Sequence, residues 1–234
     1  MNDQAEPSRH ALNSPARRDE HEGDGATRGT DRMEAFADGV FAIAFTLPVV
    51  ELTAPEVSSE EFGRALLYLW PSYAGYLLSA ALIGLYWVHH HFSGAIYRTT
   101  GHWFLLATVV FLGMIGFIAF PARVFAEHMI DPAAGPAGTR YWVISVTVLA
   151  WSWLLKWVVG RRRGQVDPRL EPSYVTRLNR RYWLYTAGMT LAAIVVLFNW
   201  QVGLAISSLF LLTLVVPPET PRYRTEAPIV EGES

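Results

Sequence analysis

The sequence has no cysteine and only one lysine among its 234 residues. The absence of cysteine excludes disulfide bonds and thiolate metal sites. Several catalytic motifs are also missing: there is no G-x-S-x-G elbow, no phosphate-binding loop, no glycine-rich dinucleotide fingerprint and no H-E-x-x-H pair. No two carboxylates are paired within the apolar segments. We therefore expect a protein that is not an enzyme and that needs no cofactor.

The N-terminal segment, residues 1–30, has almost no large apolar side chain, so it lacks the apolar core of a secretory signal. It is rich in glycine, proline and charges of both signs, and such a segment cannot bury enough apolar surface to offset its ordering entropy. We predict a disordered polar tail over 1–30, a membrane domain over 31–217 and a short cytoplasmic tail over 218–234.

The rest of the chain is dominated by long apolar runs, and 51% of all residues are hydrophobic. A bilayer core is about 30 Å thick and is crossed by roughly 20 apolar residues in a helix. The fold class we predict is an all-α integral membrane protein with six transmembrane helices. The expected spans are 33–52, 63–88, 103–124, 141–160, 182–198 and 202–217. The last two are separated only by a tight turn at Asn199–Gln201.

The arginines predict the orientation of these spans. Fifteen arginines fall on the side that holds both termini, and only Arg64, Arg123 and Arg140 fall on the other side. Because cytoplasmic loops are enriched in basic residues, both termini should be cytoplasmic, in a multi-pass protein of the cell membrane. Topology and anionic lipid headgroups account for the arginine clusters, so we expect no nucleic-acid partner.

The first predicted helix has an apolar face that repeats at three- and four-residue steps. This face consists of Phe36, Gly39, Ile43, Leu47 and Val50, and Thr46 borders it. An apolar stripe of this kind is usually plain packing against lipid or a neighbouring helix, so it does not by itself indicate a pore. Asp38 points away from the stripe and is the sharper signal.

Asp38 stands alone in apolar sequence. A carboxylate deep in a bilayer costs roughly 2.5–3.5 kcal/mol on insertion scales, so such groups usually have partners. One interpretation is a carboxylate near a helix N-terminus that is favoured by the macrodipole and reaches water. The other is a polar lock to Trp87, His89 or His90, at the end of the second predicted span. The three consecutive histidines, His89 to His91, point about 100° apart on a helix, so we expect no metal site there.

The stretch "RMEAFADGVFAIAFTL" at 32–47 resembles the signature of the transmembrane protein 175 family, the endolysosomal potassium channels and their bacterial relatives. Arg32, Phe36 and Asp38 take the R, F and D positions of its R-x-x-x-F-S-D motif. "YWVHHHF" at 86–92 and "FP" at 120–121 also resemble the family, and the resemblance covers roughly 32–216. Three features depart from the pattern: Ala37 replaces the motif serine, Pro48 follows "FTL", and the third helix lacks an expected asparagine.

The resemblance implies a potassium-permeable leak channel in the bacterial plasma membrane. It implies a homotetramer in which the first helix of each subunit lines the pore, and a single copy of the motif fits four subunits. By the same resemblance Ile43 is the main constriction, Leu47 and Val50 form further rings, and Thr46 supplies a hydroxyl. The motif residues Arg32, Phe36 and Asp38 would lock this helix to Trp87, His89 and His90.

Two other functions stay open at this point. One is a proton channel or secondary transporter that uses Asp38 and the histidines, although the sequence shows neither an inverted repeat nor a pair of broken helices. The other is a membrane scaffold without transport. The T-V-G-Y-G filter of ordinary potassium channels is absent, so any potassium selectivity must arise from other groups.

Overall fold

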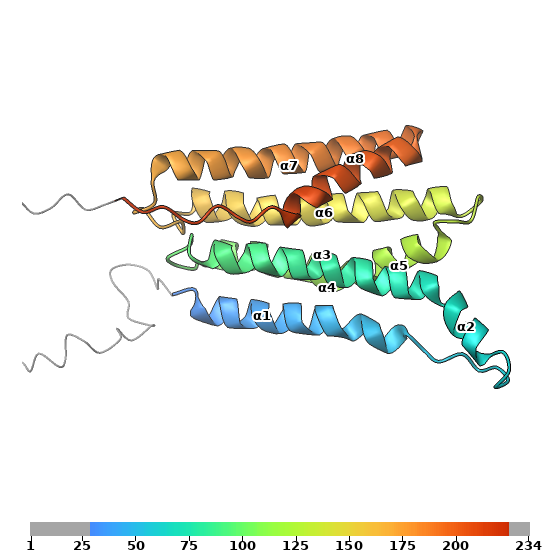
Figure 1. Cartoon of the computed structure of the whole chain (residues 1–234). Helices are drawn as coiled ribbons and strands as arrows, with labels where there is room; N and C mark the ends of the chain where they lie inside the picture. Colours follow the sequence, from blue (N-terminus) through green and yellow to red (C-terminus); the bar gives the residue numbers. More distant parts are fainter. Residues whose placement is uncertain (1–28, 225–234) are drawn as a thin grey trace, which may run out of the picture.

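Long apolar runs fold as helices in a membrane because lipid offers no partners for backbone N–H and C=O groups. The computed structural model describes residues 29–224, and these form an elongated helical bundle (Figure 1). All but the last two residues of the predicted 1–30 tail lie outside the described part. The elements are α1 (Asp31–Thr46), η2 (Leu47–Glu51), α2 (Phe62–Tyr68), α3 (Trp70–Gly94), α4 (His102–Phe117), α5 (Ala119–His128), α6 (Gly135–Arg162), α7 (Pro172–Phe198), α8 (Trp200–Leu212) and η3 (Thr213–Val215).

Within residues 29–224, four helical stretches are long and apolar enough to cross a membrane: Asp31–Glu51, His102–His128, α6 and α7. A fifth is the pair α2 and α3, which is bent by 44° at its break. The stretch Trp200–Val215 is apolar but shorter. The all-α class is confirmed, and the chain is a multi-pass membrane protein.

Several boundaries differ from the prediction. The α-helical part of the first span ends at Thr46 and continues as a 3₁₀ turn, because Pro48 has no N–H to donate to the Ala44 carbonyl. The second helix runs on to Gly94, so the three histidines lie within it rather than at its end. The fifth begins at Pro172 instead of residue 182. Its arginines can extend their charged heads to water while their stems cover apolar surface.

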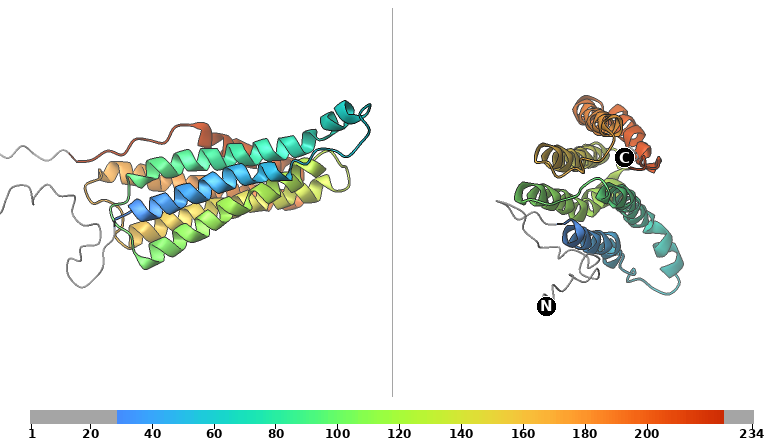
Figure 2. Two further views of the ribbon diagram at one scale, coloured as in Figure 1. Left: turned by 90° about the horizontal axis from the view of Figure 1, so that it is seen from below. Right: turned by 90° about the vertical axis from the view of Figure 1, so that its left-hand side faces the viewer.

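The helices form a bundle with α1 on one side and α7 and α8 on the opposite side (Figures 1 and 2). α1 packs against α3 and α4, while α6 contacts α4, α5, α7 and α8. The core is rich in aromatic rings, including Tyr86, Phe111 and Trp153, which meet at centroid distances of 5.0–6.0 Å. Both ends of the described chain lie at the same end of the bundle (Figure 1).

The segment after η3 runs back along the bundle toward that end (Figure 1). Side chains of earlier helices bind backbone carbonyls of η3 and of this segment: His89 Nε2 lies 2.8 Å from the Leu214 oxygen in η3, and the Tyr174 hydroxyl donates to the Glu219 oxygen of the segment at 3.2 Å. The start of the predicted C-terminal tail is therefore attached to the bundle.

Candidate functional site: the outer face of α1 and its polar support

The predicted apolar stripe is the bare face of α1. The exposed fractions of Ile43, Leu47 and Val50 are 60%, 59% and 68%, whereas Ala37 and Phe41 on the other face are 0% and 2% exposed. α1 therefore has one face packed on α3 and α4 and an opposite, largely exposed apolar face that continues onto η2, where Leu47 and Val50 lie. Large apolar side chains on such a face need lipid or another subunit to cover them.

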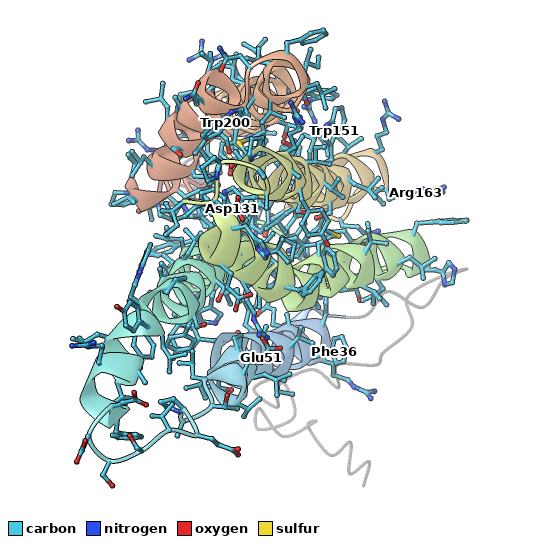
Figure 3. All side chains as sticks on the ribbon, turned by 90° about the vertical axis from the view of Figure 1, so that its right-hand side faces the viewer. Phe36, Glu51, Asp131, Trp151, Arg163 and Trp200 are labelled. Carbon is cyan, nitrogen blue, oxygen red and sulfur yellow. The ribbon has the colours of Figure 1, made fainter. Side chains whose placement is uncertain are left out.

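Two further residues of the motif also lie on the outer part of α1. Phe36 is 58% exposed at the outer edge of the bundle (Figure 3), and Arg32 is exposed one turn earlier. The Thr46 hydroxyl donates to the Ala42 carbonyl at 2.8 Å, so its proton is held by its own helix. Its oxygen keeps free lone pairs that can accept a hydrogen bond or contact a cation.

Asp38 contacts α3 through Trp87, whose indole Nε1 donates to Asp38 Oδ1 at 3.0 Å. The Trp87 ring stacks on His91 at a centroid distance of 5.7 Å, which restricts its rotation. Asp38 and Trp87 also line a groove of about 540 Å³ between α1 and α3, together with Phe45 and Thr46. One of the three predicted partners thus reaches the carboxylate.

The other two predicted partners of Asp38 contact different elements. His89 bonds to the carbonyl of Leu214, as described above. His90 is 3% exposed, stacks on Phe111 at 6.0 Å and meets the edge of Phe41 at 5.4 Å. His89 is turned about 200° from Trp87 around α3, and His90 is stacked on α4 through Phe111, so only Trp87 meets the carboxylate.

Ala37 replaces the motif serine at a fully buried position of α1. It belongs to the same apolar cluster as Phe41, Phe111 and Ile115. A hydroxyl there would need a buried partner, whereas a methyl group packs without one. The serine-to-alanine departure therefore suits the apolar surroundings that α3 and α4 provide.

Lys156 is an ionisable residue that the sequence reasoning missed. It lies on α6, is 1% exposed, and its Nζ has no hydrogen-bond partner within the described residues. The ammonium lies 5.3 Å from the ring centroids of Tyr97 and Trp153 and 5.8 Å from that of Phe111. The signal was present, since the single lysine of the chain stands inside the apolar run "WSWLLKWVVG".

Metal ligands do not gather in this part of the molecule. Among residues 29–224, no three His, Asp or Glu side chains are placed to hold one ion. The described part of the site is thus an apolar helix face with one carboxylate–indole contact behind it.

Comparison with known proteins finds relatives of this chain among potassium channels. Residues 32–119 match the family model described as endosomal/lysosomal potassium channel TMEM175. A potassium channel of Chamaesiphon minutus is 41% identical over 115 residues, which are 48% of this chain and 57% of that protein. A potassium channel of Streptomyces collinus is 28% identical over 162 residues, which are 68% of this chain and 79% of that protein.

A solved structure has a similar fold. The crystal structure of a lysosomal potassium-selective channel TMEM175 homolog from Chamaesiphon minutus matches with a TM-score of 0.65 and 26% identity. The match covers 80% of this chain and 96% of that one. The family resemblance carried by Arg32, Phe36 and Asp38 is confirmed.

Proposed function

Because the chain is similar to the TMEM175 family in sequence and in fold, we propose that it is a potassium-permeable channel of the leak type. The observation that carries the proposal is the bare apolar face of α1 and η2, on which Ile43, Leu47 and Val50 are each more than half exposed. We propose that four copies assemble around one axis with this face turned inward. Each of these residues then forms a ring of four around the pore.

The arrangement of the bundle supports this assembly. α1 packs mainly against α3 and α4, and it lies on the side of the bundle opposite α7 and α8 (Figure 2), so its exposed face can be turned toward a central axis. We propose six crossings, made by α1 with η2, α2 with α3, α4 with α5, α6, α7, and α8 with η3. The termini would lie on the cytoplasmic side of a bacterial plasma membrane, where most arginines gather.

The proposed mechanism uses the water shell of the ion. An apolar ring at Ile43 offers no polar groups, so an ion must cross with a distorted or partly removed shell. Potassium holds its water less tightly than sodium, so its barrier is lower, and a tighter ring would dewet and close. Thr46 would offer a hydroxyl oxygen beside the ring. Asp38 lies off the pore face and would position α1 through Trp87.

A proton pathway is the second candidate function. It is favoured by two buried side-chain nitrogens without a hydrogen-bond partner in the described chain, His90 Nε2 and Lys156 Nζ. A proton pathway predicts a proton current that does not depend on Ile43. A scaffold without transport predicts no flux of either ion.

The test is ion flux into liposomes that contain the purified protein, with potassium, sodium and proton gradients applied separately. Ile43→Asn should wet the constriction, raise the flux about tenfold for each 1.4 kcal/mol removed from the barrier, and abolish the preference for potassium. Asp38→Asn is the matched control, because it introduces the same residue on the same helix away from the pore face. It should keep the potassium preference.

Unchanged selectivity in the Ile43 variant would contradict the assignment of the constriction. A proton flux that exceeds the potassium flux in the unmodified protein would favour the second candidate instead.

A further inference from the structure

A cavity of about 390 Å³ lies beside the end of α8, among α3, α6, α7 and the segment after η3. α8 has 13 residues and is therefore about 20 Å long. This is about 10 Å less than the apolar thickness of a bilayer. The chain then continues as a 3₁₀ turn and an extended segment, which leaves a gap beside α7 where α8 ends.

The cavity wall toward the termini is basic. Arg177, Arg180 and Arg181 contribute to its lining, and Glu219 is the one carboxylate among the lining residues. Arg177 forms an ion pair with Glu219 at 2.7 Å, and hydrogen bonds from Arg177 hold the pKa of Glu219 below its ordinary value. Arg181 Nη2 reaches only the Val216 carbonyl, at 3.4 Å. Arg180 and Arg181 therefore form no ion pair within the described chain.

Apart from His89 and Thr213, the remainder of the cavity lining is aromatic and aliphatic. It includes Trp153, Leu184 and Phe210. The hydroxyls of Tyr86 and Tyr185, two of the three lining tyrosines, lie 3.3 Å apart and share one hydrogen bond. A hydrocarbon chain would bury apolar surface against the floor formed by Trp153, Leu184 and Phe210.

We propose that this cavity binds an anionic phospholipid of the cytoplasmic leaflet, with its phosphate between Arg180 and Arg181 and an acyl chain against the aromatic floor. Basic pockets between transmembrane helices on the cytoplasmic side are suited to anionic headgroups. The proposal rests on the membrane orientation given under the proposed function. A phosphate in solution would satisfy the arginines and leave the floor wet, so the lipid fits both halves of the cavity.

The experiment counts lipids retained by the full-length protein in native mass spectrometry. Phosphatidylglycerol and phosphatidylcholine with identical acyl chains are offered at equal concentration, and phosphatidylglycerol should be retained in preference. Each arginine near the membrane surface contributes about fivefold in affinity, so Arg180→Gln with Arg181→Gln should weaken phosphatidylglycerol binding roughly 25-fold. Glu219→Gln removes the opposing charge and should strengthen it.

The matched control is Arg161→Gln with Arg162→Gln, which removes the same charge from the end of α6, outside the cavity lining. It should leave phosphatidylglycerol retention within twofold of the unmodified protein. An equal loss in both double variants would overturn the site in favour of general surface attraction. Equal retention of the two lipids would also overturn it.

Competition with inorganic phosphate and glycerol phosphate separates a lipid site from a soluble-anion site. Neither should displace phosphatidylglycerol at millimolar concentration, and displacement by both would overturn the assignment to lipid. Potassium flux measured on the same variants keeps the two proposals apart. A conducting channel without lipid preference refutes only the lipid site, and a non-conducting protein that retains lipid refutes only the proposed channel.

Discussion

Asp38 and Lys156 are both ionisable residues inside apolar helices, yet only Asp38 could be interpreted from the sequence. Asp38 stands in a motif, and the next predicted span offers candidate partners on the same side of the membrane. One of them, Trp87, donates its indole N–H to Asp38. Lys156 has no such local context, because the rings around it come from α4, α6 and the loop after α3. Distant segments create its environment, so sequence alone can mark it as unusual but cannot predict its surroundings.

The buried amine of Lys156 predicts a stabilising substitution. Lys156→Met keeps the length of the side chain and its contact with Trp153 but removes the cost of burying an ammonium group without a hydrogen bond. Replacement of buried charges by apolar residues of similar volume is often neutral or stabilising by about 1–4 kcal/mol. Thermal unfolding in detergent should therefore shift upward or stay unchanged. Lys156→Gln keeps a buried polar group and should be less stable than Lys156→Met.

A lower unfolding temperature for Lys156→Met than for the unmodified protein would show that the ammonium contributes more to the fold than its burial costs. The potassium preference should be the same in both variants, because Lys156 lies on α6, away from the outer face of α1.

At the level of elements, the α7–α8 hairpin shows where sequence signals suffice. The turn was expected at Asn199–Gln201, and the break is in fact Asn199 alone, whose Oδ1 accepts from the Val202 N–H at 3.1 Å. Asparagine is a strong N-cap, so the residues around Asn199 are enough to predict where α8 begins. The bend between α2 and α3 comes just before Pro71, and the break at Ile118 comes just before Pro121. A proline cannot donate a hydrogen bond to the preceding turn, so both breaks also have a local signal in the sequence.

The hairpin also depends on Gly203, which the sequence does not distinguish from the other helical glycines. A Cβ at this position would lie 2.4 Å from the Val196 Cα of α7, a backbone atom that cannot rotate away. Gly203→Ala should therefore push α8 from α7 and destabilise the protein by about 1–3 kcal/mol, as overpacking does. The measurement is thermal unfolding of the purified protein.

Gly113→Ala is the matched control, since a Cβ there meets nothing within 4 Å in the single chain. It should be neutral or stabilising by about 0.5–1 kcal/mol, which is the usual gain of alanine over glycine inside a helix. Equal destabilisation by both substitutions would contradict the close approach of α7 and α8.

At the scale of the whole molecule, the apolar runs predict the helical class and roughly where the helices lie. They predict less about whether α8 crosses the membrane. A helix of 13 residues is too short to span the bilayer by itself, but it is long enough to enter it. Nor can they show which face of α1 is bare, since stripes that contact lipid, protein or a pore have the same period. The bundle itself separates the faces by covering Ala37 and Phe41 and leaving Ile43 open.

The orientation of the whole bundle gives the last prediction. The segment before α2 and the start of α7 lie at opposite ends of the bundle (Figure 1). Ser59 belongs to the first and Ser173 to the second, and both are exposed. The chain has no native cysteine, so Ser59→Cys and Ser173→Cys each introduce one reactive thiol. A maleimide that cannot cross the membrane should label intact cells only at position 59, because arginine-rich loops stay in the cytoplasm. After lysis both positions should react, which controls for accessibility. Labelling of position 173 alone from outside would show that the protein has the opposite orientation. The arginines beside α8 would then meet the outer leaflet instead of the cytoplasmic one.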